Sequence, residues 1–195
     1  MANNNLLLFI QNILPIPTTI ATEIVNHFKD ISIPKNHYLV QEGKISNEYV
    51  FLLDGLIRSY TFDTEGNDIT TNFYTKNHIV LEVSSFFNRT PAQESFQALT
   101  DCKGLIINYE QVQILFHSIP EFREFGRKVL VQNITTLKQR MLSMINQTAE
   151  ERYEDLILTK PEILQNAPLK NIATYLGITD TSLSRIRKEF TKKGG

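Results

Sequence analysis

Four polar side chains near the C-terminus recur at helical spacing and could contact a nucleic acid. They are Thr181, Ser184, Arg185 and Lys188, which lie on one outward face if residues 180–190 form a helix. Arginine can bond to a guanine edge through two donors, and hydroxyl and ammonium groups bond to phosphate oxygens. The chemistry expected of this face is therefore recognition of a polyanion.

Two short helices separated by Gly177 would position that face. Apolar residues recur at steps of three and four in both segments: Leu169, Ile172, Ala173 and Leu176, then Leu183, Ile186 and Phe190. Ala173 permits a close approach of the two helices, Gly177 supplies the backbone of a sharp turn, and Thr179 is an expected N-cap. Pro168 is expected at the first position of the first helix. The pattern predicts a helix-turn-helix.

The predicted reading head contains more residues than its outward face. The complete set of candidate DNA-binding residues is Lys170, Thr179, Asp180, Thr181, Ser182, Ser184, Arg185, Arg187 and Lys188. Arg185 is the candidate for guanine, whereas Arg187 and Lys188 are directed more toward phosphates. Asp180 either caps its own helix or accepts from a cytosine amino group. The alternative is an αα-hairpin whose charges are only solvated.

The charge distribution favours a polyanionic partner bound through one end of the chain. Residues 168–195 contain six Lys/Arg and two Asp/Glu, a net charge of +4, whereas residues 1–167 contain 14 and 19, a net charge of −5. The total of −1 conceals this asymmetry. A cationic tail on an acidic body is typical of proteins that bind nucleic acid through one domain.

Composition argues against several other classes. The 195 residues are 42% apolar and contain one cysteine, Cys102, so we expect neither an internal disulfide nor a zinc or iron–sulfur cluster. The apolar run at 6–10 has no basic residue before it and is interrupted at once, so we expect no signal peptide and no membrane span. A reducing cytoplasm fits this composition.

The middle of the chain predicts a β-rich domain. Helices are expected at 5–14 and 17–30, the second burying Ile20, Ile24, Val25 and Phe28. Short β-rich runs follow at 31–33, 37–40, 49–53, 56–62, 69–75, 78–81, 94–99 and 103–108. Strands at such regular spacing indicate a jelly roll or small barrel, with a short helix at 82–87.

A long helix at 121–147 is expected to join two copies of the chain. It carries apolar residues in heptad steps at Leu130, Ile134, Leu137, Met141 and Met144, which we call the seam. Phe122, Phe125 and Val129 lie on another face and would cover the β domain. We therefore expect a homodimer with two-fold symmetry; the alternative is a helix buried within one domain.

From residue 109 onward the chain is expected to be mainly helical. Helices are predicted at 109–118 and 149–159, and a short one begins at Pro161. Residues 145–149 are the expected hinge. The predicted fold class is α+β, with a β-roll domain and its N-terminal helices at 1–120, a dimerisation helix at 121–147 and a helix-turn-helix domain at 148–195.

These segments together resemble the Crp/Fnr family, the cyclic-AMP receptor and fumarate–nitrate regulators, most closely its Bacteroidetes-type branch. The matching stretches are EGK at 42–44, FLLDGLIRSY at 51–60, the loop 81–95, the long helix, AEERY at 149–153 and IATYLGITDTSLSRIRK at 172–188. The resemblance implies a cyclic-nucleotide-binding-like β-roll, a dimer and a transcriptional regulator that binds double-stranded DNA. It also implies RNA polymerase as a candidate partner and an effector of unknown identity.

Two residues depart from the family members that bind cyclic AMP. Their loop holds Gly-Glu for the ribose and Arg-Ser for the phosphate, whereas this chain has Leu81-Glu82 and Glu94-Ser95. Glu82 could still accept a ribose hydroxyl. A Glu94 carboxylate about 4 Å from a phosphate oxygen would cost about 4 kcal/mol at an effective dielectric constant of about 20. That is roughly three orders of magnitude in affinity, so we expect no tight binding of cyclic AMP.

The lining of the sensor cavity can be predicted only as a set. The candidates are Arg58, Phe73, Glu82, Val83, Ser84, Ser85, Glu94 and Ser95, although the apolar ones among them could be simple core. Arg89 is close in sequence and could reach the phosphate position. The resemblance also implies a β-hairpin wing after the recognition helix, but only five residues follow Phe190. We expect no full wing, with Lys192 and Lys193 on a flexible arm.

Three other functions remain open. The β-roll could bind a cyclic nucleotide or another small molecule in a protein with weak or no DNA binding. The helix-turn-helix could serve interactions alone. A cupin-type metalloenzyme would need clustered histidines, but His27, His37, His78 and His117 are widely separated, and a haem site at His78 has no second feature behind it. We expect no enzyme activity, no metal and no cofactor.

Overall fold

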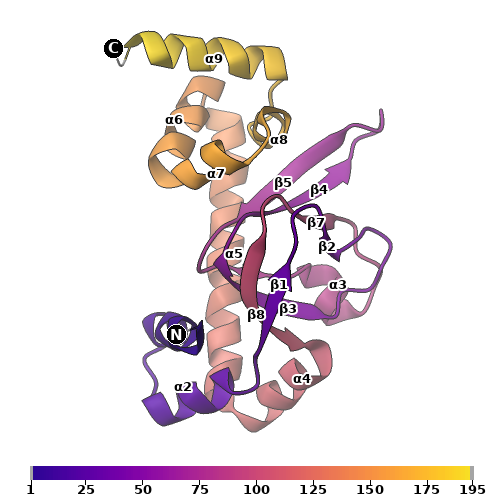
Figure 1. The fold of residues 1–195 in the computed structure, drawn as a ribbon, viewed down its shortest axis with the longest axis vertical. Helices are drawn as coiled ribbons and strands as arrows, with labels where there is room; N and C mark the ends of the chain where they lie inside the picture. Colours follow the sequence, from indigo (N-terminus) through magenta and orange to yellow (C-terminus); the bar gives the residue numbers. More distant parts are fainter. Residues whose placement is uncertain (1, 194–195) are drawn as a thin grey trace.

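The computed structural model describes residues 2–193 (Figure 1). Two four-stranded antiparallel sheets form a β-roll, in the orders β1-β8-β3-β6 and β2-β7-β4-β5. The strands are β1 (Lys29–Ile33), β2 (Tyr38–Val40), β3 (Glu48–Asp54), β4 (Ile57–Phe62), β5 (Asp68–Tyr74), β6 (Ile79–Val80), β7 (Ser95–Ala98) and β8 (Cys102–Asn108). The predicted jelly-roll architecture is confirmed.

The central strand β3 is apolar at every position between its charged ends because both of its faces are covered. Val50 and Leu52 are buried between the two sheets, whereas Tyr49 and Phe51 are buried on the opposite face of β3 against helices. Side chains alternate between the faces of a strand, so a strand covered on both sides must be apolar at every position. The helices on that outer face are α1 (Ala2–Ile13), α2 (Thr18–Val25), α4 (Tyr109–Ser118) and the first half of α5 (Pro120–Asn146).

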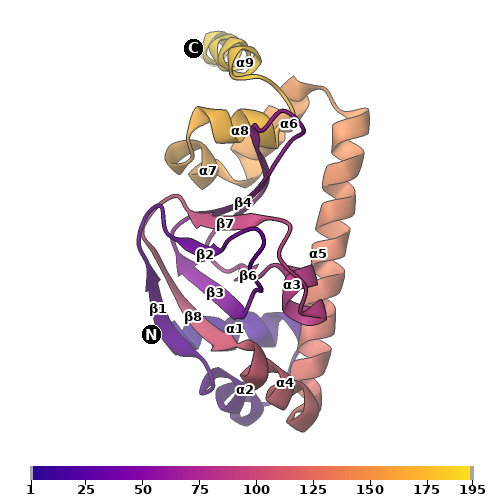
Figure 2. The same ribbon diagram turned by 90° about the vertical axis from the view of Figure 1, so that its right-hand side faces the viewer.

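The long helix α5 forms one edge of the molecule and connects its two ends (Figure 2). Phe122, Phe125 and Val129 are buried against the β-roll, as predicted. Another face of α5 is open, with Ile134 65% and Leu137 66% exposed. One helix thus has two apolar faces, and only one of them is covered within the chain.

The C-terminal helices form a small cluster at one end of the molecule. They are α6 (Ala149–Thr159), α7 (Pro161–Asn166), α8 (Leu169–Tyr175) and α9 (Asp180–Lys193). Thr148 and Glu151 form a capping box at the start of α6, so the predicted hinge contracts to two residues between α5 and α6. Their apolar core includes Leu56, Phe73 and Leu99 of the β-roll, which joins the two parts of the chain.

Three expected boundaries were wrong. The predicted helix at 17–30 ends at Val25, because the chain turns at 26–28 to enter β1. Pro168 is the N-cap of α8 and not its first helical residue. Residues 191–193 continue α9, so the arm expected there is helical; Gly194 and Gly195 lie outside the described residues.

Gly177 is required at the turn between α8 and α9. Its φ of +70° is in the left-handed region, and a Cβ there would overlap the terminal methyl of Met144 on α5. Gly177→Ala is expected to lower the free energy of unfolding by about 1–2 kcal/mol through the backbone alone. Chemical denaturation would measure this loss.

Gly66 provides the matched control for this substitution. It has a φ of +83°, and a Cβ there would meet nothing within 4 Å. Gly66→Ala should therefore report the backbone cost without a collision. Wild-type stability for Gly177→Ala would show that the turn does not need glycine.

Candidate nucleic-acid interface and sensor site

The helix-turn-helix forms as predicted, through apolar contacts and local hydrogen bonds. Ile172 and Ala173 of α8 and Leu183 and Ile186 of α9 are buried together. The amide of Ile178 donates to the carbonyl of Ala173 at 3.0 Å, which closes the turn after the helix. These contacts hold α9 across α8 at the end of the molecule farthest from α2 and α4 (Figure 1).

The predicted DNA-contacting side chains of α9 share its exposed face. Thr181, Ser184, Arg185, Arg187 and Lys188 are all exposed. The face carries three cations and two hydroxyl groups, a combination that can bond to phosphates and to base edges. α9 therefore presents the chemistry expected of a recognition helix.

Thr179 and not Asp180 caps α9. The Thr179 hydroxyl accepts from the amide of Ser182 at 3.2 Å and donates to the Ser182 hydroxyl at 3.0 Å. Both side chains are thus engaged at the start of the helix. Of the two roles suggested for Asp180, the N-cap is wrong, because Asp180 is an exposed residue of the first turn. Its negative charge there interacts favourably with the helix dipole.

Lys170 is the one candidate that contacts the β-roll. Its ammonium lies 3.9 Å from a carboxylate oxygen of Asp68, whose other oxygen accepts from Arg58 at 3.1 Å. Arg58 is also stacked over Tyr60. Lys170 is 59% exposed at its side chain, so the pair with Asp68 is weak and leaves the lysine available to a stronger partner.

The first helix of the motif, α8, rests on β5 of the β-roll. The Thr174 hydroxyl accepts from the amide of Thr70 at 3.1 Å, and the rings of Phe73 and Tyr175 lie 5.1 Å apart. Phe73 was predicted to line the sensor cavity, but it is buried against Tyr175 in the core of the C-terminal helices. This helix-to-sheet contact could not be read from either segment alone.

Most of the other predicted cavity residues are hydrogen-bonded within the fold or exposed. Glu82 caps α3 (Val83–Asn88) by accepting from the amide of Ser85. The hydroxyls of Ser85 and Ser95 accept from the amides of Ser46 and Glu42 at 2.8 and 3.0 Å. Of the remaining candidates, Val83 and Ser84 have exposed side chains, and Arg58 forms an ion pair with Asp68. Most of these groups therefore serve the fold of the loop.

Glu94 is the candidate with the most altered electrostatics. Burial raises the pKa of its carboxyl above the ordinary value, while hydrogen bonding with Thr71 and the charge of Arg140 oppose that rise. Arg89 does not reach Glu94 in this structure. It donates to the carbonyl of Ser46 at 2.8 Å and stacks 4.1 Å from the centre of the Tyr109 ring.

Arg140 is the functional candidate that the sequence did not reveal. It lies on α5, five helical turns after Phe122 and so on the same face, but it is charged, so the apolar periodicity gives no signal for it. Its guanidinium donates to the carbonyls of Thr71 and Tyr175 and stacks 4.1 Å from the centre of the Tyr175 ring. One side chain thus joins the long helix, the β-roll and the helix-turn-helix.

Residues 2–193 contain neither a cluster of metal-binding side chains nor a helix suited to a bilayer. Histidine, cysteine, aspartate and glutamate nowhere gather in threes that could hold a metal ion there. Within the same range, every helix is too short or too polar to cross a membrane.

The chain is similar to a known domain family and to two bacterial regulators. The cyclic nucleotide-binding domain family matches residues 30–118, from β1 to the end of α4. Electron transport regulator A of Shewanella oneidensis is 24% identical over 93% of this chain and 78% of its own. The anaerobic regulatory protein of Haemophilus influenzae is 25% identical over 83% of this chain and 66% of its own.

Solved structures extend the likeness over the complete fold. FixK2 from Bradyrhizobium japonicum has a TM-score of 0.71 at 18% identity, covering 86% of each chain. The catabolite activator protein of Thermus thermophilus has a TM-score of 0.58 at 14% identity, covering 95% of this chain and 88% of its own. Residues 30–118 match the cyclic nucleotide-binding domain family, and the complete fold is similar to that of Crp/Fnr-type regulators, which are also its sequence neighbours. Its assignment to the Bacteroidetes-type branch stays a prediction.

Proposed function

We propose that this protein is a homodimeric transcriptional regulator that binds a palindromic operator through α9 of each subunit. The exposed cationic face of α9, built on a capped and packed helix-turn-helix, is the observation that carries this proposal. The exposed seam on α5 supplies the surface for the second copy. Two recognition helices related by two-fold symmetry would enter major grooves about 34 Å apart.

The three functional parts are those expected from the sequence. Residues 1–120 serve as sensor domain, 121–147 as dimerisation helix and 148–195 as DNA-binding domain. We place the protein in the cytoplasm, where its DNA target lies, and assign it no enzymatic activity. RNA polymerase is the proposed partner when the dimer is bound near a promoter.

A gel-shift series with competitors tests this function. Labelled promoter DNA from the host genome should be retained when unlabelled nonspecific duplex or heparin is added, and released by unlabelled specific duplex. Binding that heparin removes as readily as specific duplex does would instead favour a helix-turn-helix that serves protein interactions alone.

Arg185 is expected to determine base specificity. Arg185→Ala should lose about 1–3 kcal/mol of discrimination at one base pair in each half-site, because a bidentate contact to guanine is removed. Binding to a panel of single-base operator variants would measure it.

Arg187→Ala is the matched control for Arg185. Arg187 is an exposed arginine of the same helix and is directed toward phosphate in our assignment. Its replacement should weaken all operator variants by a similar factor. An unchanged base preference in Arg185→Ala would remove Arg185 from the reading head.

We also propose that cyclic AMP is not the effector. The half-buried Glu94 occupies the loop position where the resemblance expects arginine, and Arg89 is bonded elsewhere. Thermal-shift titration should therefore show no stabilisation at micromolar cyclic AMP, with adenosine as the control that lacks a phosphate. A rise in Tm with micromolar cyclic AMP but not with adenosine would contradict this prediction.

A further inference from the structure

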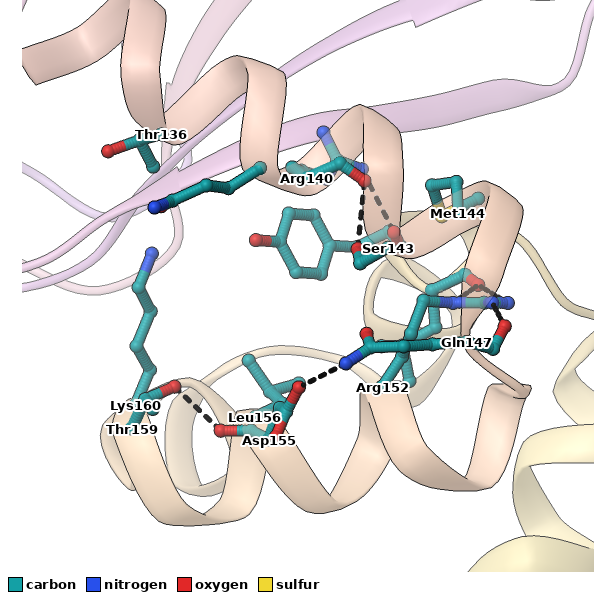
Figure 3. A pocket seen from close by; sticks show the side chains of 13 residues that line it. Thr136, Arg140, Ser143, Met144, Gln147, Arg152, Asp155, Leu156, Thr159 and Lys160 are labelled. Atoms are coloured by element: carbon teal, nitrogen blue, oxygen red, sulfur yellow. Dashed lines mark hydrogen bonds between the residues drawn. The ribbon is translucent and has the colours of Figure 1, made fainter.

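A cavity lies outside the sensor loop, between the long helix and the C-terminal helices. It has a volume of about 430 Å³ and is lined by α5, α6 and the end of α8; we call it the hinge pocket. This volume is within the range of small-molecule sites in proteins. Figure 3 shows its side chains arranged around an open centre.

The pocket is cationic. Arg140, Arg152 and Lys160 line it, against a single carboxylate at Asp155. That carboxylate is already engaged, because it accepts from the side-chain amide of Gln147 at 3.0 Å (Figure 3). Fully ionised, these four groups have a net charge of +2, which is the opposite of the charge of a phosphate monoester near neutral pH.

The two guanidinium groups are held in place before any ligand arrives. Arg140 donates to the carbonyl of Tyr175 at 2.9 Å. Arg152 donates to the carbonyl of Gln147 at 2.6 Å and to that of Leu176 at 2.9 Å. Carbonyl partners fix the orientation of each planar group without neutralising its charge. The carboxyl of Glu94, outside the pocket lining, offsets part of the charge of Arg140, whereas Arg152 keeps its full charge.

Lys160 is the group that lacks a counterpart. Its ammonium extends from the end of α6 toward α5 (Figure 3), and it forms no hydrogen bond or ion pair with the rest of residues 2–193. Burial and the neighbouring charge of Arg140 both lower the pKa of Lys160, while Glu162, outside the pocket, opposes this. A half-buried ammonium facing another cation is stabilised when an anion enters.

The remaining lining suits the organic part of such a ligand. Leu156, Leu176 and the ring of Tyr175 provide an apolar wall. The side-chain oxygen of Gln147 is buried without a hydrogen-bond partner in the described chain and can accept from a ligand hydroxyl. We propose that the hinge pocket binds a small organic phosphate monoester, with its phosphate between Lys160 and Arg140.

Occupancy would connect the long helix to the DNA-binding domain. Arg140 also bonds to Thr71 of β5, and Leu176 immediately precedes the Gly177 turn. A phosphate held by α5 and α6 together would fix the angle at which α9 is presented. This regulatory consequence rests on the proposed function, whereas the binding itself does not.

The test uses the full-length protein with ribose 5-phosphate and inorganic phosphate as probes and ribose as the uncharged control. The pentose phosphate should raise Tm by about 2–4 °C at several times its Kd, and ribose should not. Lys160→Gln should abolish the rise. Lys103→Gln, which removes an exposed lysine of β8, should retain it.

Lysine labelling locates the ligand even if Lys160→Gln is unstable. The lowered pKa makes the Lys160 amine reactive toward an amine-specific reagent, and peptide mass spectrometry reports modification at each lysine separately. Ribose 5-phosphate should protect Lys160 and leave Lys103 unchanged.

The proposal is overturned if millimolar ribose 5-phosphate neither protects Lys160 nor raises Tm. It is also overturned if Lys103 is protected equally, or if only inorganic phosphate acts, which would indicate an adventitious ion only. Gel-shift assays without added phosphate monitor DNA binding separately, so a failure of the pocket would leave the proposed function standing.

Discussion

Operator affinity should fall about 10³–10⁵-fold when monovalent salt is raised from about 50 to about 200 mM. Each protomer brings four or five cations near the duplex, from Lys170 and from the exposed face of α9. A dimer would therefore neutralise about 6–10 phosphates and release their counterions. Fluorescence anisotropy at a series of salt concentrations measures the slope of log affinity against log salt.

Lys188→Ala provides an internal check on this slope. Lys188 is exposed on α9 and is assigned to phosphate, so its removal from both subunits should reduce the magnitude of the slope by about two. Gln165→Ala changes an exposed residue of α7 without changing charge and should leave the slope unaltered. A salt-independent affinity would show that α9 does not bind the duplex backbone.

Disrupting the seam should abolish both the dimer and tight operator binding. Ile134 and Leu137 are about two-thirds exposed in the single chain, so replacing both by glutamate should leave the protomer folded. In a dimer the same change would place four carboxylates in an apolar interface. Losing the second recognition helix removes an avidity gain of about 10²–10⁴ in affinity. Analytical ultracentrifugation and anisotropy would measure the two effects.

Leu158→Glu is the matched control for the seam. Leu158 is a similarly exposed apolar residue, 74% accessible, but it lies on α6. The Leu158→Glu variant should therefore remain dimeric and bind the operator normally. If the seam variant is dimeric and binds normally, a different surface must join the subunits.

The β-roll and the recognition helix could be predicted because local patterns determine them. Each expected strand lies within two residues of an observed one, since alternation and turn residues fix strands locally. The outward face of α9 could be predicted for the same reason. Its apolar stripe, Gly177 and Thr179 each have one structural use, and all three agree.

The contacts between the two parts of the chain could not be predicted. Phe73 has the alternation of a strand residue, and nothing in its neighbourhood distinguishes a cavity wall from a surface that receives α8. Arg140 and Lys160 acquire their environments from segments more than 30 residues away or from another helix. Periodicity reports which face of an element is buried, and it does not report the partner that buries it.

Selection of bound sequences from random duplex DNA tests the central claim most directly. The purified full-length protein should enrich a palindromic consensus whose half-sites are one helical turn apart, about 10–10.5 base pairs between centres. Such a consensus would support DNA recognition, two-fold symmetry and the assignment of α9 together. Enrichment of no sequence, or of a single half-site without symmetry, would contradict a dimeric operator-binding regulator.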